Sequence, residues 1–493
     1  MKPVVINFLR LLLFAFSLAA LAGEPELKPV PCLKLANGPD YWAPAFADIY
    51  RLLALNLKPP EPPFKTRYAV PAPKFKKEVY LWDTAFIALV WQWRDADVAQ
   101  EIFLPLFEIA GPDGMIPHSS LQTNDSQPPV LSWSVWRIFQ ATGDRSYLEK
   151  VYPALKNYNL WLYQKRTMPN GLFFWDNRFE SGLDNSPRFT NRSATRIRDL
   201  SRLAAVDLCS YMVMDDLALA QMAEVLGRKD DAAEFRKKAQ ALKELVNRYL
   251  WDEKDGLYYD FDFKKNRLVK INNNCSFLPL AAGIPGQDQA QKLLRHIMDP
   301  AEYNSLIPLP TIALNHPNFF LDMWMGPVWL NIDYLIILGM KDYGFNAQAS
   351  ELTWKLAGGL YQIWSRDRTF YEFYDPQSLE INNLHRKTGT WGTWSGREDT
   401  PVRDFVGWTG LVNNLVIEVM FGLSKKGESW TLRPCFPRQA SGRIFSLSLP
   451  ADNLEVSLEL KSPDQIKALV LQSGKSMSFE LGAGRSASWA SRQ

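Results

Sequence analysis

The chain has 493 residues and a formal net charge of +3, from 56 Lys and Arg and 53 Asp and Glu. This length exceeds one ordinary core, so we expect one large helical domain with an appendage, or two domains. The 47% hydrophobic and 22% charged composition excludes a disordered chain. The basic residues are dispersed, which argues against partners such as nucleic acid or a charged membrane surface.

The N-terminus has the pattern of a secretory signal peptide. Lys2 and Arg10 precede an apolar run over residues 11–21, and Ala20-Leu21-Ala22 forms a small-x-small cleavage site before Gly23. The run is too short to be a permanent membrane anchor. We therefore expect residues 1–22 to be removed, and the mature protein to be secreted or periplasmic with no membrane attachment.

Helical periodicity continues along most of the chain that follows. Helices are predicted near residues 43–57, 81–94, 97–110, 129–142, 146–166, 203–227, 230–250, 274–282, 286–299, 326–340, 344–365 and 402–422. An even set of helices joined by loops of unequal length favours a toroid of helix pairs, with the long loops gathered at one mouth. The predicted fold is mainly α, with this helical domain over residues 40–423.

The pattern changes after residue 425. Phe445, Leu447 and Leu449 alternate with serines, and the same period of two returns over residues 454–460 and 477–481. Residues 425–493 are therefore predicted to form a small antiparallel β module.

Tryptophan is the unusual component, with 18 copies. Its ring stacks on the apolar C–H faces of sugars, so a Trp-rich chain with acids in loops suggests a carbohydrate substrate. We expect at least half of these rings to fill the core instead.

One acid lies in a stretch that can be neither helix nor strand. Asp184 is flanked by Gly182, Asn185, Ser186 and Pro187, which all interrupt regular structure. Nearby aromatic residues would wall it into a partly dry pocket, where desolvation favours the protonated form that a general acid needs: Phe174, Trp175, Phe179 and Phe189. The alternative is an Asp that only caps its own turn.

Further polar and aromatic side chains recur where loops meet helices. They are Tyr80, Trp82 and Asp83 in Tyr80-Leu81-Trp82-Asp83-Thr84-Ala85-Phe86, His118, Gln127 in Ser126-Gln127-Pro128-Pro129, Trp329 in Gly326-Pro327-Val328-Trp329, Glu372 among four aromatics in residues 370–376, and Trp408. Each is weak alone, but their shared position at such junctions predicts a common site.

These motifs, with Glu180-Ser181-Gly182-Leu183-Asp184-Asn185-Ser186-Pro187-Arg188 and the final Gly407-Trp408-Thr409-Gly410-Leu411-Val412, resemble the (α/α)6-barrel glycoside hydrolases of family 63. The resemblance is strongest to their mannosylglycerate and glucosylglycerate hydrolase branch, with trehalases more distant, and it covers about residues 40–423. It implies that Asp184 is the general acid and Glu372 the general base. It also implies that Trp82, Asp83, Gln127 and Trp329 bind sugar in the innermost subsite. Met325 stands where this family usually carries Arg. This difference bears on the identity of the substrate more than on the type of reaction.

The remaining candidate substrate contacts come from the same loops. They are Tyr80, His118, Trp175, Asn185, Arg188 and Trp408. No metal or cofactor is expected: the four cysteines (Cys32, Cys209, Cys275, Cys435) have no C-x-x-C spacing, and G-x-S-x-G, H-E-x-x-H and phosphate-binding glycine motifs are absent from the sequence. Disulfide pairing and oligomeric state have no sequence signal.

The function predicted is an inverting, exo-acting α-glycosidase for α-glucosides or α-mannosides. Asp184 and Glu372 come from separate loops, which allows the carboxyl separation of about 6.5–9.5 Å of an inverting mechanism. Long loops around residues 111–128, 167–202 and 366–401 would crowd one entrance and favour small substrates. The alternatives are a trehalase-like α-glucosidase, a catalytically weak sugar-binding relative, and a lyase or epimerase, which would need a Tyr, His or Lys base.

Overall fold

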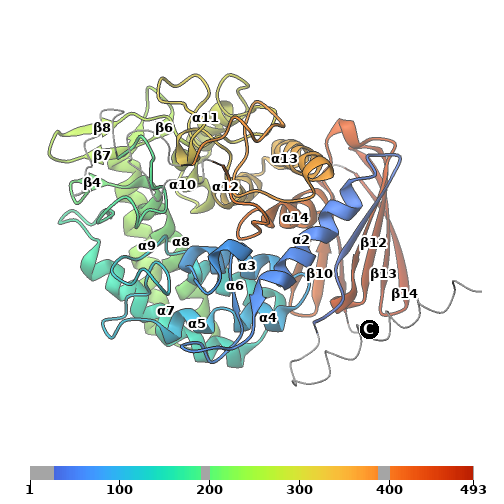
Figure 1. Cartoon of the computed structure of the whole chain (residues 1–493), viewed down its shortest axis with the longest axis horizontal. Coiled ribbons are helices and arrows are strands. Elements are labelled where there is room, and N and C mark those ends of the chain that lie inside the picture. Colours follow the sequence, from blue (N-terminus) through green and yellow to red (C-terminus); the bar gives the residue numbers. More distant parts are fainter. Residues whose placement is uncertain (1–26, 190–199, 387–399, 483, 492–493) are drawn as a thin grey trace, which may run out of the picture.

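The structure, a computed structural model, describes residues 27–189, 200–386, 400–482 and 484–491. The predicted signal peptide lies outside these ranges. Helices form a rounded body, and antiparallel strands stand along one side of it (Figure 1). Within the described ranges, no helix has the length and apolar character needed to cross a membrane. The prediction of a mainly helical fold with a small antiparallel β region is confirmed.

Six helices form a closed ring. They are α3 (Leu81–Trp91), α6 (Leu131–Thr142), α8 (Val206–Val225), α10 (Leu278–Ala281), α12 (Leu330–Asp342) and α14 (Leu411–Leu415). Each contacts the next in this order, and α14 contacts α3. Every residue of α3 is buried, as expected of a helix that is apolar on all sides and covered all round.

A second set of helices packs outside this ring. It comprises α2 (Trp42–Asn56), α4 (Ala96–Glu101), α5 (Leu104–Glu108), α7 (Arg145–Lys165), α9 (Lys229–Tyr249), α11 (Gln287–Ile297) and α13 (Asn346–Asp367). Both α7 and α9 contact α8, and α13 contacts α2 and α12. The buried residues of α9 are spaced three and four apart, Ala232, Phe235, Ala239, Leu242 and Val246, so one stripe faces the core.

Three predicted helices differ from the observed ones. The segment near 274–282 is a 3-10 turn, Asn274–Phe277, followed by the short α10. The segment near 97–110 is divided into α4 and α5, because Pro105 lies in the first turn of a new helix. The segment near 402–422 becomes helical only at Leu411, and its second half, Val416–Met420, is a π-helical turn. Such turns are rare and occur often at functional positions.

The β module is larger than predicted because it recruits the N-terminal part of the chain. Its main sheet has the order β1 (Cys32–Ala36), β11 (Ile444–Leu449), β12 (Leu454–Ser462), β13 (Gln465–Gln472), β14 (Lys475–Leu481). A second sheet has the order β15 (Ala487–Ala490), β10 (Ser429–Leu432), β9 (Leu423–Lys426). The alternating residues of β12 are buried on one face, which matches the predicted period of two. Strand β1, which pairs antiparallel with β11, was not predicted, because alternation over only five residues is a short signal.

The other strands are short and connect helices: β2 (Leu57–Lys58), β3 (Tyr68–Ala69), β4 (Leu203–Ala204), β5 (Trp251–Asp252), β6 (Leu257–Tyr258), β7 (Asp260–Asp262) and β8 (Arg267–Val269). More than half of the 18 tryptophans are buried, as expected. None of the four cysteines forms a disulfide.

Candidate active site

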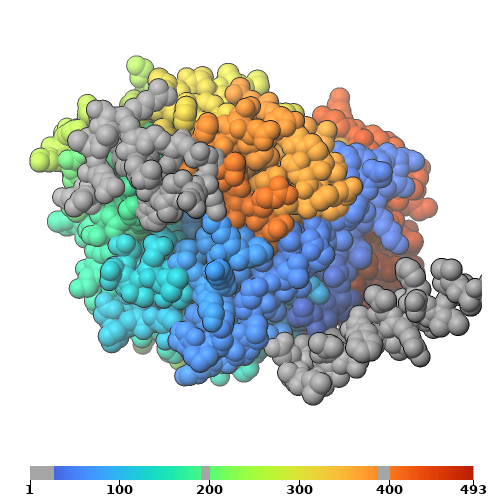
Figure 2. All heavy atoms as spheres, in the orientation of Figure 1, coloured from blue at the N-terminus to red at the C-terminus, as the bar shows by residue number. Residues whose placement is uncertain are grey.

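Five candidate residues lie where ring helices begin. Trp82 and Asp83 are in the first turn of α3, Trp329 directly precedes α12, Trp408 precedes α14, and Gln127 precedes α6. They also meet in space: the Trp82 ring centroid lies 5.6 Å from that of Trp408, and the Trp408 centroid 5.4 Å from that of Trp329. On the face shown in Figure 2, the blue segment of the first hundred residues packs against the orange segment near residue 400.

The Asp184 loop is built against the ring of Trp82. Gly182 has a φ of +71°, and a Cβ at this position would lie 2.6 Å from the indole, so only glycine fits. Asn185 fixes the other side of the loop, because its side chain donates to the Asp322 carbonyl (3.1 Å) and accepts from the Trp324 N–H (2.9 Å). Within residues 181–189, Asp184 alone is half-buried and the rest are buried. The loop therefore presents this carboxyl to the site.

Glu372 lies in the segment of residues 370–376 and is only 4% exposed. One carboxylate oxygen accepts from Arg386 Nε at 3.0 Å. Its own carbonyl accepts from the Trp408 indole N–H at 2.9 Å, which ties this segment to the start of α14. The acid is thus held on a rigid support and paired with one cation.

Arg386 pairs with Glu372, lies within electrostatic reach of Asp184, and was not among the predicted site residues. The charge of Glu372 raises the pKa of the Arg386 guanidinium, burial lowers it, and the charge of Asp184 raises it further. Both carboxylates are therefore near the same cation. Arg386 falls outside every quoted motif and follows Glu372 by fourteen residues, so no sequence signal pointed to it.

Asp83 is a second buried acid beside Glu372. Burial, and then the charge of Glu372, raise its pKa well above the ordinary value. A protonated Asp83 can donate a hydrogen bond, which suits recognition of a sugar hydroxyl.

Gln127 and His118 form a small polar network beneath Trp82. Gln127 accepts from the Trp82 backbone N–H at 3.2 Å and donates its amide to His118 Nε2 at 2.9 Å. This pairing assigns the imidazole proton to Nδ1, which is buried. Burial lowers the pKa of His118, while nearby Asp184 raises it. Tyr80 packs edge-on against His118, with ring centroids 5.9 Å apart.

The aromatic candidates form a compact wall with Trp324, another residue that the sequence reasoning missed. The Trp324 ring stacks on Trp329 with centroids 3.7 Å apart and lies 5.9 Å from Trp82. The indole N–H of Trp329 donates to the Met323 carbonyl at 2.9 Å, and its side chain is 1% exposed. Trp329, which was predicted to bind sugar, is therefore almost fully covered in this structure and supports the wall from behind.

Arg188 and Trp175 were predicted to contact substrate, but the structure places them in a buried charged cluster. Arg188 donates to both Asp207 and Asp260, at 2.6–2.9 Å, and its side chain is 1% exposed. Trp175 donates to the same Asp207 at 3.0 Å. The guanidinium is engaged by two carboxylates and faces no solvent, so these residues anchor the base of the Asp184 loop instead of touching a sugar.

No group of three or more His, Cys, Asp or Glu side chains is arranged to hold a metal ion in the described ranges. The predicted mouth loops at 167–202 and 366–401 include residues 190–199 and 387–399, which lie outside those ranges.

Two loop acids near one arginine, a further buried acid and an aromatic wall at one end of a ring of helices suit the hydrolysis of a glycoside. The mannosylglycerate hydrolase MGH1-like glycoside hydrolase domain matches residues 76–391, more than half of the chain. The chain belongs to this family.

Related proteins are similar at low identity. The mannosylglycerate hydrolase of Rubrobacter radiotolerans is 26% identical over 396 residues, covering 63% of this chain and 88% of that protein. An uncharacterized protein of Borreliella burgdorferi is 26% identical over 227 residues, which span 46% of this chain and 45% of that protein. The periplasmic trehalase of Salmonella newport is 24% identical over 425 residues, 74% of this chain and 70% of the trehalase.

Among solved structures, the GH63 mannosylglycerate hydrolase of Thermus thermophilus in complex with glucose superposes with a TM-score of 0.61. It is 26% identical to this chain, and the match covers 75% of this chain and 99% of the hydrolase.

Proposed function

We propose that the chain is an inverting, exo-acting α-glycosidase, and that its ring of six helices is the inner layer of an (α/α)6 toroid. The observation that carries the proposal is the approach of Asp184 and Glu372 to Arg386 from two different loops. Two acids on separate loops suit the wide spacing of an inverting mechanism, which leaves room for a water molecule.

In this mechanism Asp184 protonates the leaving oxygen and Glu372 directs water to the opposite face of the anomeric carbon. The exposure of Asp184 suits contact with a leaving group, while the buried Glu372 is fixed by Arg386 and the Trp408 segment. Asp83, Gln127 and Trp82 would hold the sugar that is released, since they lie together beside Glu372.

The leaving group is proposed to lie over Phe320. This ring is 46% exposed and stacks on His385, with centroids 6.0 Å apart, directly beside Arg386 in the chain. An exposed ring next to the catalytic pair suits the apolar face of a second sugar. Met325 supplies no guanidinium for an acidic leaving group, so neutral disaccharides, as in a trehalase, compete with glycosyl glycerates as substrates.

The test is a panel of α-linked disaccharides and glycosyl glycerates, with product anomers followed by NMR. The proposal expects the β-anomer of a single sugar to appear first. Initial release of the α-anomer would indicate a retaining mechanism. In a separate incubation with a long α-linked polysaccharide, the early appearance of internal fragments would contradict exo action. Sugar binding by calorimetry without any hydrolysis would favour the catalytically weak relative.

Export is proposed from the N-terminal pattern alone. Sequencing the N-terminus of the mature protein from its native host should begin at or near Gly23. Retention of residues 1–22 would contradict it.

A further inference from the structure

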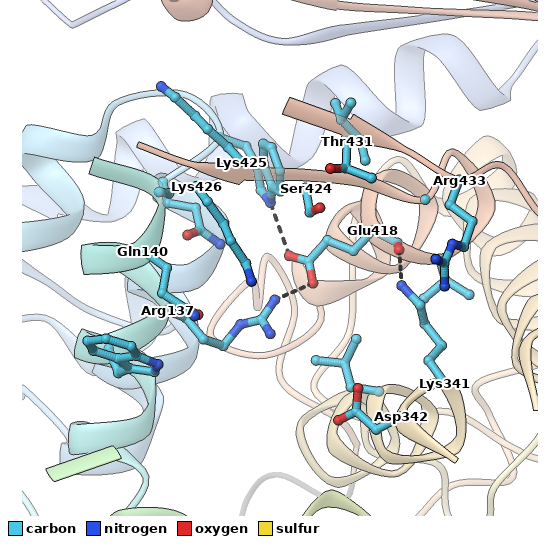
Figure 3. A pocket seen from close by; sticks show the side chains of 18 of the residues that line it. Arg137, Gln140, Lys341, Asp342, Glu418, Ser424, Lys425, Lys426, Thr431 and Arg433 are labelled. Carbon is cyan, nitrogen blue, oxygen red and sulfur yellow. Dashed lines mark hydrogen bonds and ion pairs between the residues drawn. The ribbon is translucent and has the colours of Figure 1, made fainter. Parts of the chain in front are cut away.

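A cavity of about 1020 Å³ lies between the helices and the β module (Figure 3). Its lining includes Arg137 and Gln140 from the last turns of α6, Lys341 from the end of α12, and residues of β9 and β10. The candidate active site occupies the beginnings of α6 and α12. Most of the lining residues of α6 and α12 lie in the second halves of these helices, so the cavity is centred toward the opposite end of the ring from the candidate active site.

The acid at the centre of this cavity, Glu418, already has protein hydrogen-bond partners. Glu418, on the π-helical turn Val416–Met420, accepts from Arg137 at 2.6 Å, from the Tyr334 hydroxyl at 2.8 Å and from the Trp93 indole at 3.3 Å. Its backbone carbonyl accepts from Lys341. Figure 3 shows Arg137 and Lys341 reaching Glu418 from two sides. This network is therefore a fixed wall of the cavity.

Positive charge remains after these pairs are formed. The lining contains six cations, Lys28, Arg137, Lys341, Lys425, Lys426 and Arg433, and three acids, Asp342, Glu418 and Asp452. Asp452 is paired with Lys425, and Lys28 with acids outside the lining. Lys426 and Arg433 form no ion pair within the described residues.

The position of these two cations is informative. Lys341 lies in the last turn of α12, where the helix dipole alone favours positive charge, and Arg137 is held by its ion pair with Glu418. Lys426 ends strand β9, and Arg433 follows strand β10, so no helix end accounts for them. In Figure 3 both belong to the β module side and lie on either side of Glu418. Two exposed cations that converge on one cavity create a field that attracts an anion.

The neutral part of the lining adds a second property. Gln140, Gln221, Asn346, Ser424 and Thr431 offer amides and hydroxyls, and Trp133 and Trp136 offer ring surface. This mixture suits a ligand with many hydroxyls.

We propose that this cavity binds a sugar-sized polyhydroxyl anion, carrying a carboxylate or a phosphate, held by Lys426 and Arg433. The site is separate from the catalytic one and does not depend on the proposed hydrolysis.

The test is titration calorimetry of the full chain at low ionic strength with D-galacturonate, glucose 6-phosphate, inorganic phosphate and glucose. The two charged sugars distinguish carboxylate from phosphate ligands. At least one of them should bind, while glucose should not bind at this cavity. The double variant Lys426→Ala/Arg433→Ala should weaken that binding by about tenfold or more, since it removes two charged hydrogen-bond donors. Both side chains are exposed, so the fold should be kept, and an unchanged Tm checks this.

Two controls locate the binding. Lys461→Ala/Lys467→Ala removes two exposed cations from the β module away from the cavity lining and should leave affinity unchanged. Asp184→Asn should also leave it unchanged. Equal affinity in the Lys426/Arg433 double variant, loss of binding in Asp184→Asn, or no binding of either charged sugar would overturn the proposal. Inorganic phosphate binding as tightly as the sugars would overturn the polyhydroxyl part.

Discussion

At the scale of single residues, Gly182 decides how the Asp184 loop lies on Trp82. Gly182→Ala adds a methyl group 2.6 Å from the indole at a φ of +71°. We expect the free energy of unfolding to fall by about 1–3 kcal/mol and kcat to fall by about 10²-fold, because a displaced acid loses its geometry. Gly143→Ala is a matched control: its φ is +69°, but nothing lies within 4 Å of the new Cβ. Equal kcat values for the two variants would contradict the role of the contact.

Arg386 gives a second prediction at this scale. Arg386→Met removes the guanidinium that donates to Glu372, so we expect kcat to fall by about tenfold or more with little change in KM, since the base loses the hydrogen bond that fixes its carboxylate. Steady-state kinetics with Arg368→Met, an exposed cation stacked on Trp364, serves as control. A change confined to KM would instead assign Arg386 to substrate binding.

At the scale of elements, periodicity predicted most helices and the β module, because both depend on local patterns of burial. It could not predict that β1 would join β11, since the pairing of Leu33 with Leu447 joins the two ends of the chain. The candidate site shows the same contrast between features set by local sequence and features set by distant residues. Motifs identified the Asp184 and Glu372 loops, whereas the burial of Arg188 depends on Asp260, 72 residues away, which no local pattern reveals.

Helix α11 carries a histidine whose ion pair makes the stability of the fold depend on pH. His296 pairs with Glu302 (Nδ1 to Oε2, 2.7 Å), and this hydrogen bond raises the pKa of the histidine. The stabilisation is therefore present below the unfolded pKa of about 6.5 and is lost as pH rises through the folded pKa. His296→Gln should lower Tm more at pH 5.5 than at pH 8.5. The corresponding loss in the free energy of unfolding should be less than about 1 kcal/mol, because the pair is partly exposed.

His316 is the control with the opposite sign. Burial lowers its pKa, so its wild-type form loses stability as pH falls below about 6.5. The Tm difference caused by His316→Gln should therefore shrink or reverse at low pH. The same pH trend in both variants would contradict the assignment.

At the scale of the whole molecule, the β module and the helices share one core. Phe445 of β11 lies 6.2 Å from Trp42 of α2, 6.4 Å from Phe421 and 4.9 Å from Phe436, measured between ring centroids. Phe445→Ala should cost about 3–5 kcal/mol and lower a single calorimetric transition, with activity lost at the same temperature. Leu471→Ala, at an exposed position in β13, should change little. Two separate transitions, with activity surviving the first, would show independent domains.

The central claim is that Asp184 is the general acid and Glu372 the general base. The most direct test measures Asp184→Asn and Glu372→Gln on a natural glycoside and on the matching α-glycosyl fluoride, whose leaving group needs no proton. We expect both variants to lose about 10²-fold or more in kcat on the glycoside with an unchanged Tm. Asp184→Asn should keep most of its activity on the fluoride, whereas Glu372→Gln should lose it. Near wild-type turnover of the glycoside by either variant, or the reverse response to the fluoride, would contradict these roles.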